Sequence, residues 1–160
     1  MSLLSLRTGL RFKEITGVKG HDLDFKNDII SILDSKNGQT DHVYMTPDIR
    51  KILKGYNTPP NGYVFKNKNG ERIKEVPDTF ESTVKKLGFN EGITDRRQLL
   101  TFHSLRHTFA SWLALNDEQL KTIQELMRHK TIQMTMKYAH LISDKKREAV
   151  NNIVMMKGGD

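Results

Sequence analysis

The segment LTFHSLRHTFASWLA, residues 100–114, constrains the fold more than any other, because helical periodicity and functional side chains coincide in it. At about 100° per residue, an α-helix places His103, Arg106 and His107 within one arc of its surface. Four apolar residues fall on the other side and are expected to form the buried stripe: Leu105, Phe109, Trp112 and Leu113. We interpret Trp112 as a packing residue, not as a cofactor contact. The segment therefore predicts an amphipathic helix whose polar face carries one arginine and two histidines.

Two chemistries would use this polar face, zinc binding and phosphate binding. Histidines four residues apart on a helix can bind one zinc ion, but metalloproteases place Glu directly after the first His, where this chain has Ser104. Zinc would also bring a cation next to Arg106. A guanidinium instead matches two phosphate oxygens, and His103 can donate a hydrogen bond or move a proton near neutral pH. Phosphate is therefore favoured, and His107 is expected to support Arg106 or the backbone.

Composition restricts the class of protein and of partner. A chain of 160 residues can enclose one compact domain. Lys and Arg number 26 against 19 Asp and Glu, a net charge of +7, which favours a polyanionic partner, with nucleic acid first and an anionic membrane second. These charges are spread along the chain, so taken alone they favour an ordinary solvated surface. The absence of cysteine excludes disulfides and thiolate metal sites.

Patterning along the chain predicts an α+β fold, mainly helical with a small antiparallel three-stranded sheet. Strand-like runs joined by turn-rich segments span residues 21–25, 29–33 and 42–45, and 63–73 is a short strand or loop. Helices are expected over residues 3–18, 46–56, 77–87, 100–114, 120–128, 131–138 and 143–154. Their buried faces are expected to include Leu6, Leu10, Ile15, Ile49, Ile52, Leu53, Phe80, Val84 and Leu87.

Three other segments carry side chains that could complete a phosphate site. TGLRFKEI contains Arg11, with Glu14 as an expected partner three residues on. DSKNGQT places Lys36 at the tip of a predicted hairpin, where a flexible ammonium can reach into a cleft. MRHKTIQMTMKYAH contains His129 and Tyr138, the latter near the end of a predicted helix. Each residue alone has an ordinary structural explanation, and only the joint pattern points to a site.

This ordered set resembles the catalytic domain of the tyrosine recombinases, also called phage integrases. TGLRFKEI resembles the family pattern T-G-x-R-x-x-E, FHSLRHTFASWL resembles H-x-L-R-H-T-x-A-T, and ELMRHKTIQMTMKYAH resembles L-L-G-H-x-x-I-x-T-T-x-x-Y-x-H. Arg128 replaces the usual Gly before the second histidine, so the turn there is expected to differ. In the lysine hairpin only Lys36 and Gly38 match. The resemblance implies the DNA breaking-rejoining fold, with catalytic residues Arg11, Lys36, His103, Arg106, His129 and Tyr138.

The resemblance also implies a mechanism. Tyr138 would attack a DNA phosphodiester, form a 3′-phosphotyrosine and release a 5′-hydroxyl. His103 would be the general base toward Tyr138, and Lys36 the general acid for the leaving oxygen. Arg11 and Arg106 would hold the non-bridging oxygens. His129, the remaining family position, would donate a further hydrogen bond to the phosphate. No metal, ATP or other cofactor is implied.

Further implications concern the whole protein. Residues 1–160 would be the catalytic domain, with the N-terminal DNA-clamping domain and the start of the first helix missing. The partners would be double-stranded DNA, other subunits of a tetramer, reached through the amphipathic segment 145–154, and accessory DNA-bending proteins. The same segment could instead pack on its own domain. The location implied is the bacterial cytoplasm, with association to the nucleoid on DNA.

Three alternatives stay open at this point. A DNA-binding relative that no longer cuts would use the arginines as phosphate anchors, but it has no need of Tyr138. A type IB topoisomerase shares the arginines and the tyrosine, yet usually has Lys where this chain has His103. A metal nuclease needs clustered carboxylates, and the sequence shows no such cluster.

Overall fold

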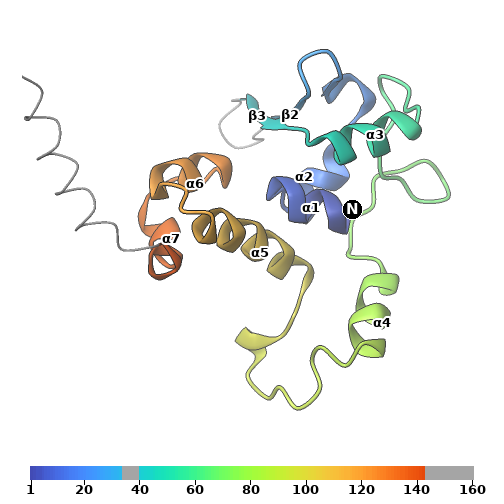
Figure 1. The fold of residues 1–160 in the computed structure, drawn as a ribbon. Helices are drawn as coiled ribbons and strands as arrows, with labels where there is room; N and C mark the ends of the chain where they lie inside the picture. The colour runs from blue at the N-terminus through green and yellow to red at the C-terminus, as the bar shows by residue number, and fades with distance from the viewer. Residues whose placement is uncertain (34–39, 143–160) are drawn as a thin grey trace, which may run out of the picture.

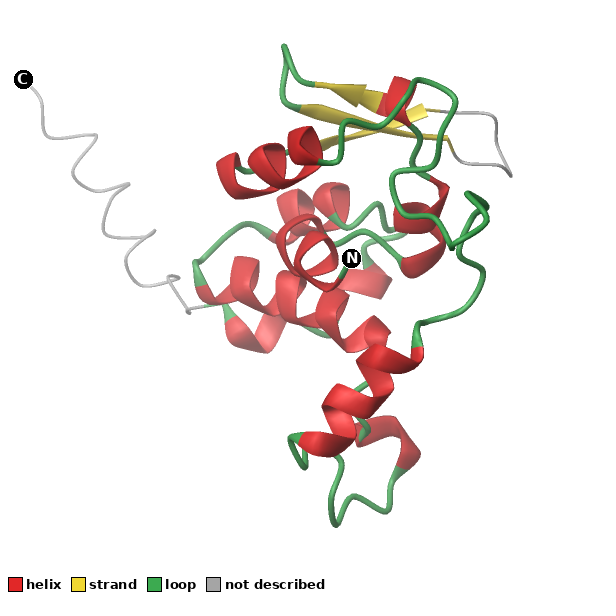
Figure 2. Cartoon of the chain, turned by 90° about the vertical axis from the view of Figure 1, so that its right-hand side faces the viewer, coloured by secondary structure: helices red, strands yellow, loops and turns green. Residues whose placement is uncertain are grey.

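The computed structural model describes residues 1–33 and 40–142, and it confirms the predicted α+β architecture. A three-stranded sheet and helix α4 (Asp78–Lys86) lie at opposite ends of the molecule, with the other α-helices between them (Figure 1, Figure 2). No helix in these two ranges is both long and apolar enough to span a membrane. Lys36 and the helix predicted over residues 143–154 lie outside the described residues.

The predicted meander is confirmed as an antiparallel sheet of order β1-β2-β3. The strands are β1 (Leu23–Asp24), β2 (Ile29–Leu33) and β3 (Thr40–Tyr44). β1 is shorter than predicted because the segment before it forms the 3-10 turn η1 (Gly20–Asp22). Alternate residues of β2 are buried, as period-two alternation requires of a sheet with one covered face. The sheet thereby closes one side of the main core.

The single helix predicted over residues 3–18 is wrong. The chain forms α1 (Ser2–Thr8) and α2 (Phe12–Gly17), separated at Gly9. Gly9 has φ +66, and a Cβ there would lie 2.5 Å from the ring of Phe109, so only glycine fits without a shift. The break reorients the chain and leaves Arg11 at the N-cap of α2.

Two short helices follow the sheet. α3 (Pro47–Gly55) starts with Pro at the first helical position, and buries Ile49 and Leu53 as predicted, whereas Ile52 is exposed. α4 (Asp78–Lys86) ends before a glycine with positive φ, as predicted, but Leu87 lies outside the helix and is exposed. The segment between the two helices contains only isolated bridges, and η2 (Arg96–Gln98) precedes the next helix.

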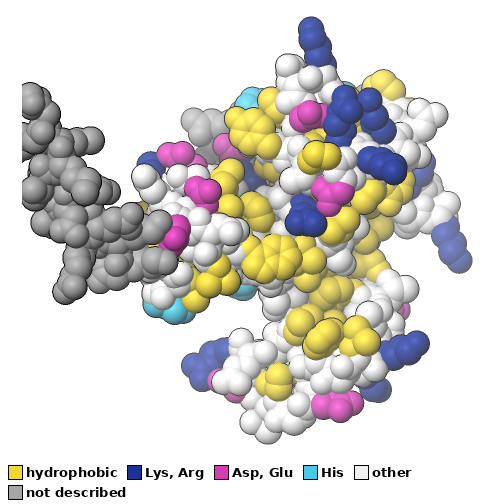
Figure 3. Space-filling model, in the orientation of Figure 1, with side chains coloured by type: hydrophobic (Ala, Val, Ile, Leu, Met, Phe, Trp, Pro, Cys, Tyr) yellow, Lys and Arg dark blue, Asp and Glu magenta, His cyan; other side chains and the backbone are white. Residues whose placement is uncertain are grey.

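α5 (Phe102–Leu115) is the central helix, and its buried face differs from the prediction. Its fully buried positions follow a spacing of four residues: Phe102, Arg106, Ala110 and Ala114. α1 packs against α5, and Ala110 and Ala114 lie in a cluster with Ile123, Met127 and Tyr138. The expected role of Trp112 in the core is wrong, since its side chain is 44% exposed. Apolar side chains are accordingly visible over α5 in Figure 3.

The C-terminal elements are α6 (Leu120–Leu126) and α7 (Gln133–Met136), both shorter than predicted, and the short 3-10 helix η3 (Ala139–Leu141), which was not predicted. α6 and residues 138–142 form a second, smaller core with the C-terminal half of α5. The first half of α5 belongs to the main core, through Phe102. Arg106 therefore lies at the junction of two hydrophobic cores, an unusual place for an arginine.

Candidate active site

The buried Arg106 guanidinium is held by the ends of two helices. Its side chain is 1% exposed, and it donates hydrogen bonds to the carbonyl oxygens of Gly9 and Met127. These residues are the C-caps of α1 and α6, where backbone carbonyls lack helical partners and carry the negative end of the helix dipole. Burial, followed by the charges of Arg11 and Arg128, lowers the pKa of Arg106 to about 10, so it stays a cation at neutral pH.

Glu14 connects two further arginines to the site. One carboxylate oxygen lies 2.8 Å from Nη1 of Arg11, which confirms the predicted pair, and the other lies 2.7 Å from Nη2 of Arg128. Burial raises the pKa of Glu14, but the charge of Arg128 and the hydrogen bonds from Arg11 outweigh burial and leave the pKa below its usual value. Arg11 is thereby positioned on one side while the rest of its guanidinium remains accessible.

The turn at Arg128 keeps a left-handed backbone, with φ +50, although the family pattern has Gly there. A left-handed residue other than Gly costs about 1–2 kcal/mol. Arg128→Ala loses the ion pair to Glu14 and keeps this strain, whereas Arg128→Gly loses the pair and relieves the strain. We expect the unfolding free energy of Arg128→Gly, measured with urea, to be about 1 kcal/mol higher than that of Arg128→Ala. Equal stabilities would mean that the turn relaxes to negative φ.

Four of the six predicted catalytic residues line one pocket of about 380 Å³. They are Arg11, His103, Arg106 and His129, and they come from the N-cap of α2, the first turns of α5 and the turn after α6. The other lining residues are His107, Met127, Gln133, Met134 and Lys137, and none is acidic. A pocket with cations, imidazoles and no carboxylate favours an anionic ligand.

The histidines of the pocket are neutral at physiological pH. Burial, followed by neighbouring cations, lowers the pKa of His103, and lowers those of His107 and His129 to about 4. His129 Nδ1 lies 2.9 Å from Oγ1 of the fully buried Thr135, which orients its ring. Neutral imidazoles can accept a proton, so they suit a site in which a hydroxyl must be deprotonated.

These shifts predict a pH dependence of stability. The unfolded chain protonates its histidines near pH 6.5, whereas folded His107 and His129 stay neutral down to about pH 4. The free energy of unfolding should therefore fall as the pH drops from about 6.5 to about 4, by less than about 1.4 kcal/mol per unit for each half-exposed ring. Urea unfolding of wild type and of His107→Gln/His129→Gln should show the shallower slope in the variant. Parallel slopes would contradict this assignment.

Tyr138 adjoins the pocket but does not line it. Its side chain is 5% exposed, and its hydroxyl lies 2.6 Å from Nδ1 of His107. The expectation that His107 supports Arg106 or the backbone is therefore wrong. The ring of His103 packs edge to face on His107, with centroids 4.7 Å apart. Burial raises the pKa of Tyr138, although the charge of Arg106 opposes this, so the phenol is protonated and donates to the imidazole.

Sequence reasoning missed four lining residues of the pocket, Met127, Gln133, Met134 and Lys137, of which only Lys137 is charged. Lys137 precedes Tyr138, and its Nζ lies 3.2 Å from His107 Nδ1. Its position in the chain was a usable signal, because it directly precedes Tyr138, the predicted nucleophile. Lys36 cannot be placed relative to the pocket, since it lies outside the described residues.

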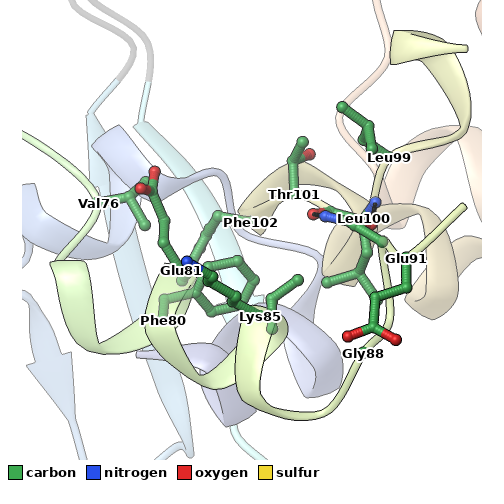
Figure 4. A pocket seen from close by; sticks show the side chains of 12 residues that line it. Val76, Phe80, Glu81, Lys85, Gly88, Glu91, Leu99, Leu100, Thr101 and Phe102 are labelled. Atoms are coloured by element: carbon green, nitrogen blue, oxygen red, sulfur yellow. Dashed lines mark hydrogen bonds between the residues drawn. The ribbon is translucent and has the colours of Figure 1, made fainter. Parts of the chain in front are cut away.

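A larger hollow lies between α4 and the start of α5 and shares no residue with this pocket (Figure 4). Its walls are mostly apolar, with Val76, Phe80, Val84, Leu99, Leu100 and Phe102 contributing. Glu81 and Lys85 also line it (Figure 4). It holds none of the predicted catalytic residues, so the smaller, cationic pocket is the candidate active site.

Comparison with known proteins agrees with this geometry. The chain is 34% identical over 143 residues to the tyrosine recombinase XerA of Saccharolobus solfataricus, covering 88% of this chain and 45% of that protein. It is 29% identical to XerC of Lactobacillus delbrueckii over 146 residues, covering 84% and 47%. The chain thus spans about half the length of these curated relatives.

Solved structures show the same fold. The Tn1549 transposon integrase in complex with circular intermediate DNA matches with a TM-score of 0.71 and 25% identity, over 95% of this chain and 58% of that one. The catalytic domain of bacteriophage HP1 integrase matches with a TM-score of 0.72 and 24% identity, over 99% and 83%. The sequence model described as "Phage integrase family" matches residues 1–145. The chain therefore belongs to the phage integrase family, as its motifs predicted.

Proposed function

We propose that this domain cuts and rejoins DNA strands at specific sites through a covalent 3′-phosphotyrosine at Tyr138. The observation that carries the proposal is the pocket itself: two arginines and three neutral histidines converge beside a buried tyrosine. Arg11 and Arg106 provide fixed positive charge for a phosphodiester, where transition-state charge is stabilised most strongly in a partly dry site. No carboxylate among the lining residues would repel that anion.

In the proposed reaction, Tyr138 Oη forms a bond to phosphorus while the bond to the 5′-oxygen breaks. The phenolic proton passes to an imidazole, with His103 as the general base once Tyr138 faces the phosphate. Lys36 supplies the proton to the 5′-oxygen, and His129 donates a hydrogen bond to a phosphate oxygen. The phosphotyrosine keeps the energy of the broken bond, so a 5′-hydroxyl can reverse the reaction without ATP.

The position of Tyr138 implies that its side chain moves before the cleavage reaction. Its hydroxyl is bound to His107 and its side chain is buried, so Tyr138 must leave this contact to reach a phosphate held by Arg11 and Arg106. The cost of breaking one such hydrogen bond is about 1 kcal/mol. We infer that DNA binding shifts the tyrosine from this closed position to a reactive one.

Double-stranded DNA is the proposed substrate, supported by the Tn1549 integrase and XerH structures solved with DNA. Assembly into a tetramer through segment 145–154 and help from DNA-bending proteins remain proposals, as does Lys36 as the acid. The curated relatives are about twice as long as this chain, so an additional domain is proposed for full recombination.

The test works on a target whose sequence is not specified in advance. The protein is incubated in EDTA with a pool of duplexes that carry a nick and randomised flanking sequence. Cleavage near the nick releases a short fragment, so the strand cannot be rejoined and the covalent adduct is trapped. Denaturation-resistant protein–DNA adducts are captured, sequenced, and digested to locate the attachment. We expect enrichment of one sequence family and attachment at Tyr138. Absence of any adduct would favour a non-catalytic DNA-binding relative, and attachment at Tyr44, Tyr56 or Tyr63 would overturn the assignment.

A further inference from the structure

We propose that Lys137 is a third phosphate-binding cation of this active site, whose ammonium contacts a non-bridging oxygen of the scissile phosphodiester beside Arg11 and Arg106. The inference rests on the proposed function and deepens it. Lys137 falls on an unspecified position of the family motif around Tyr138, so nothing in that motif requires a cation there. A phosphate contact from Lys137 would therefore be specific to this chain and not a requirement of the family motif.

The ammonium lies above the nucleophile and at the pocket. Its Nζ is 5.1 Å from the centroid of the Tyr138 ring, and 3.2 Å from His107 Nδ1. Lys137 is the C-cap of the short helix α7, so the backbone that places Tyr138 also places Lys137. Since Lys137 lines the pocket together with Arg11 and Arg106, a phosphate held by these arginines would lie within reach of this flexible side chain.

The present partners of Lys137 do not satisfy its three N–H donors. His107 Nδ1 has one lone pair, and the Tyr138 hydroxyl, at 2.6 Å, is closer to it than Lys137 is. Within residues 1–33 and 40–142, no carboxylate lies within ion-pair distance of Lys137. Among the described residues, at least two of the three donors are thus left for a ligand.

Electrostatics support an anion as that ligand. Burial, followed by the charge of Arg106, lowers the pKa of Lys137, so the charged form of Lys137 is disfavoured by its surroundings. A phosphodiester would reverse this, because its negative charge would lie among Lys137, Arg106 and Arg11. Gathering like charges around one pocket is unfavourable unless an anion compensates for them.

The test removes charge from each partner in turn. The duplex enriched in the pool experiment is made with either a normal phosphodiester or a neutral methylphosphonate at the scissile position. Adduct formation and, in a Tyr138→Phe background, equilibrium binding of the same duplexes are measured for Lys137→Met, Lys137→Arg and Lys51→Met. Lys51→Met removes an exposed ammonium on α3 that does not line the pocket.

We expect Lys137→Met to slow adduct formation about 10- to 100-fold on the phosphodiester duplex. On the methylphosphonate duplex, the factor by which the substitution slows the reaction should be several-fold smaller. Lys137→Arg should retain most activity, and Lys51→Met should match wild type on both duplexes. Equal losses on the two duplexes, or no loss, would overturn the proposal. A duplex with sulfur in place of the 5′-bridging oxygen has a leaving group that needs no proton. If this duplex restored adduct formation by Lys137→Met, the proposal would also be overturned, because Lys137 would then be the general acid.

The binding readout separates this proposal from the proposed function. If the wild type forms no adduct with any duplex, cleavage by Tyr138 is refuted. The affinity preference for the charged duplex, and its loss in Lys137→Met, would still show whether Lys137 binds the phosphate. For that arm a genomic or randomised duplex replaces the enriched one. Equal preference for the charged duplex in the Lys137 and Lys51 variants would refute the phosphate contact independently.

Discussion

Tyr138→Phe should abolish covalent adduct formation, by at least about 10⁴-fold, while the protein remains folded and binds DNA. Tyr138 is the only tyrosine adjoining the cationic pocket in the described part of the chain, and its hydroxyl is the atom that would bond to phosphorus. The substitution deletes one oxygen and one hydrogen bond to His107, so the unfolding free energy should fall by only about 1 kcal/mol. Adducts are quantified on denaturing gels, and stability by urea unfolding.

Tyr56→Phe is the matched control, since Tyr56 is 51% exposed and its ring packs on Phe65. It removes the same atom from a tyrosine outside the pocket, so adduct yield should equal that of wild type. An adduct that persists in Tyr138→Phe would show that another group attacks the phosphate. Loss of adduct together with unfolding of Tyr138→Phe would contradict the small stability change expected here.

The sequence predicted the site better than it predicted the packing around it. Motifs with fixed spacing placed Arg11, His103, Arg106 and His129 in one pocket, because each motif occupies the end of a helix where the backbone fixes the direction of the side chain. The roles of these residues remain predictions. The closed contact between Tyr138 and His107 depends on how α7 and η3 pack against α5, which periodicity does not encode.

The misplaced stripe of α5 has a physical explanation. A hydrophobic scale assigns Arg106 to the solvent and Trp112 to the core, yet the structure reverses both. The two alanines, Ala110 and Ala114, define the buried face because α5 is approached closely by other helices, and small residues permit that approach. Arg106 can join this face only because Gly9 and Met127 offer carbonyl acceptors, a contact formed by three distant segments.

Those carbonyl contacts make Arg106 the residue whose replacement should damage both stability and activity. Arg106→Met keeps the length and apolar volume of the side chain but leaves two buried carbonyls without donors. Each unpaired group costs about 1–3 kcal/mol, and relief from burying a charge offsets part of the sum. We expect a loss of about 2–4 kcal/mol in unfolding free energy, and adduct formation reduced at least about 10³-fold.

Arg11→Met separates the two effects, because Arg11 lines the same pocket but its side chain is 40% exposed. It should reduce adduct formation about 10²- to 10³-fold, with a change in unfolding free energy below about 1 kcal/mol. Arg106→Lys should recover part of the stability, since one ammonium can reach one of the two carbonyls. If Arg106→Met unfolded at the same urea concentration as Arg11→Met, the guanidinium would contribute charge to the pocket but would not hold α1 and α6 together.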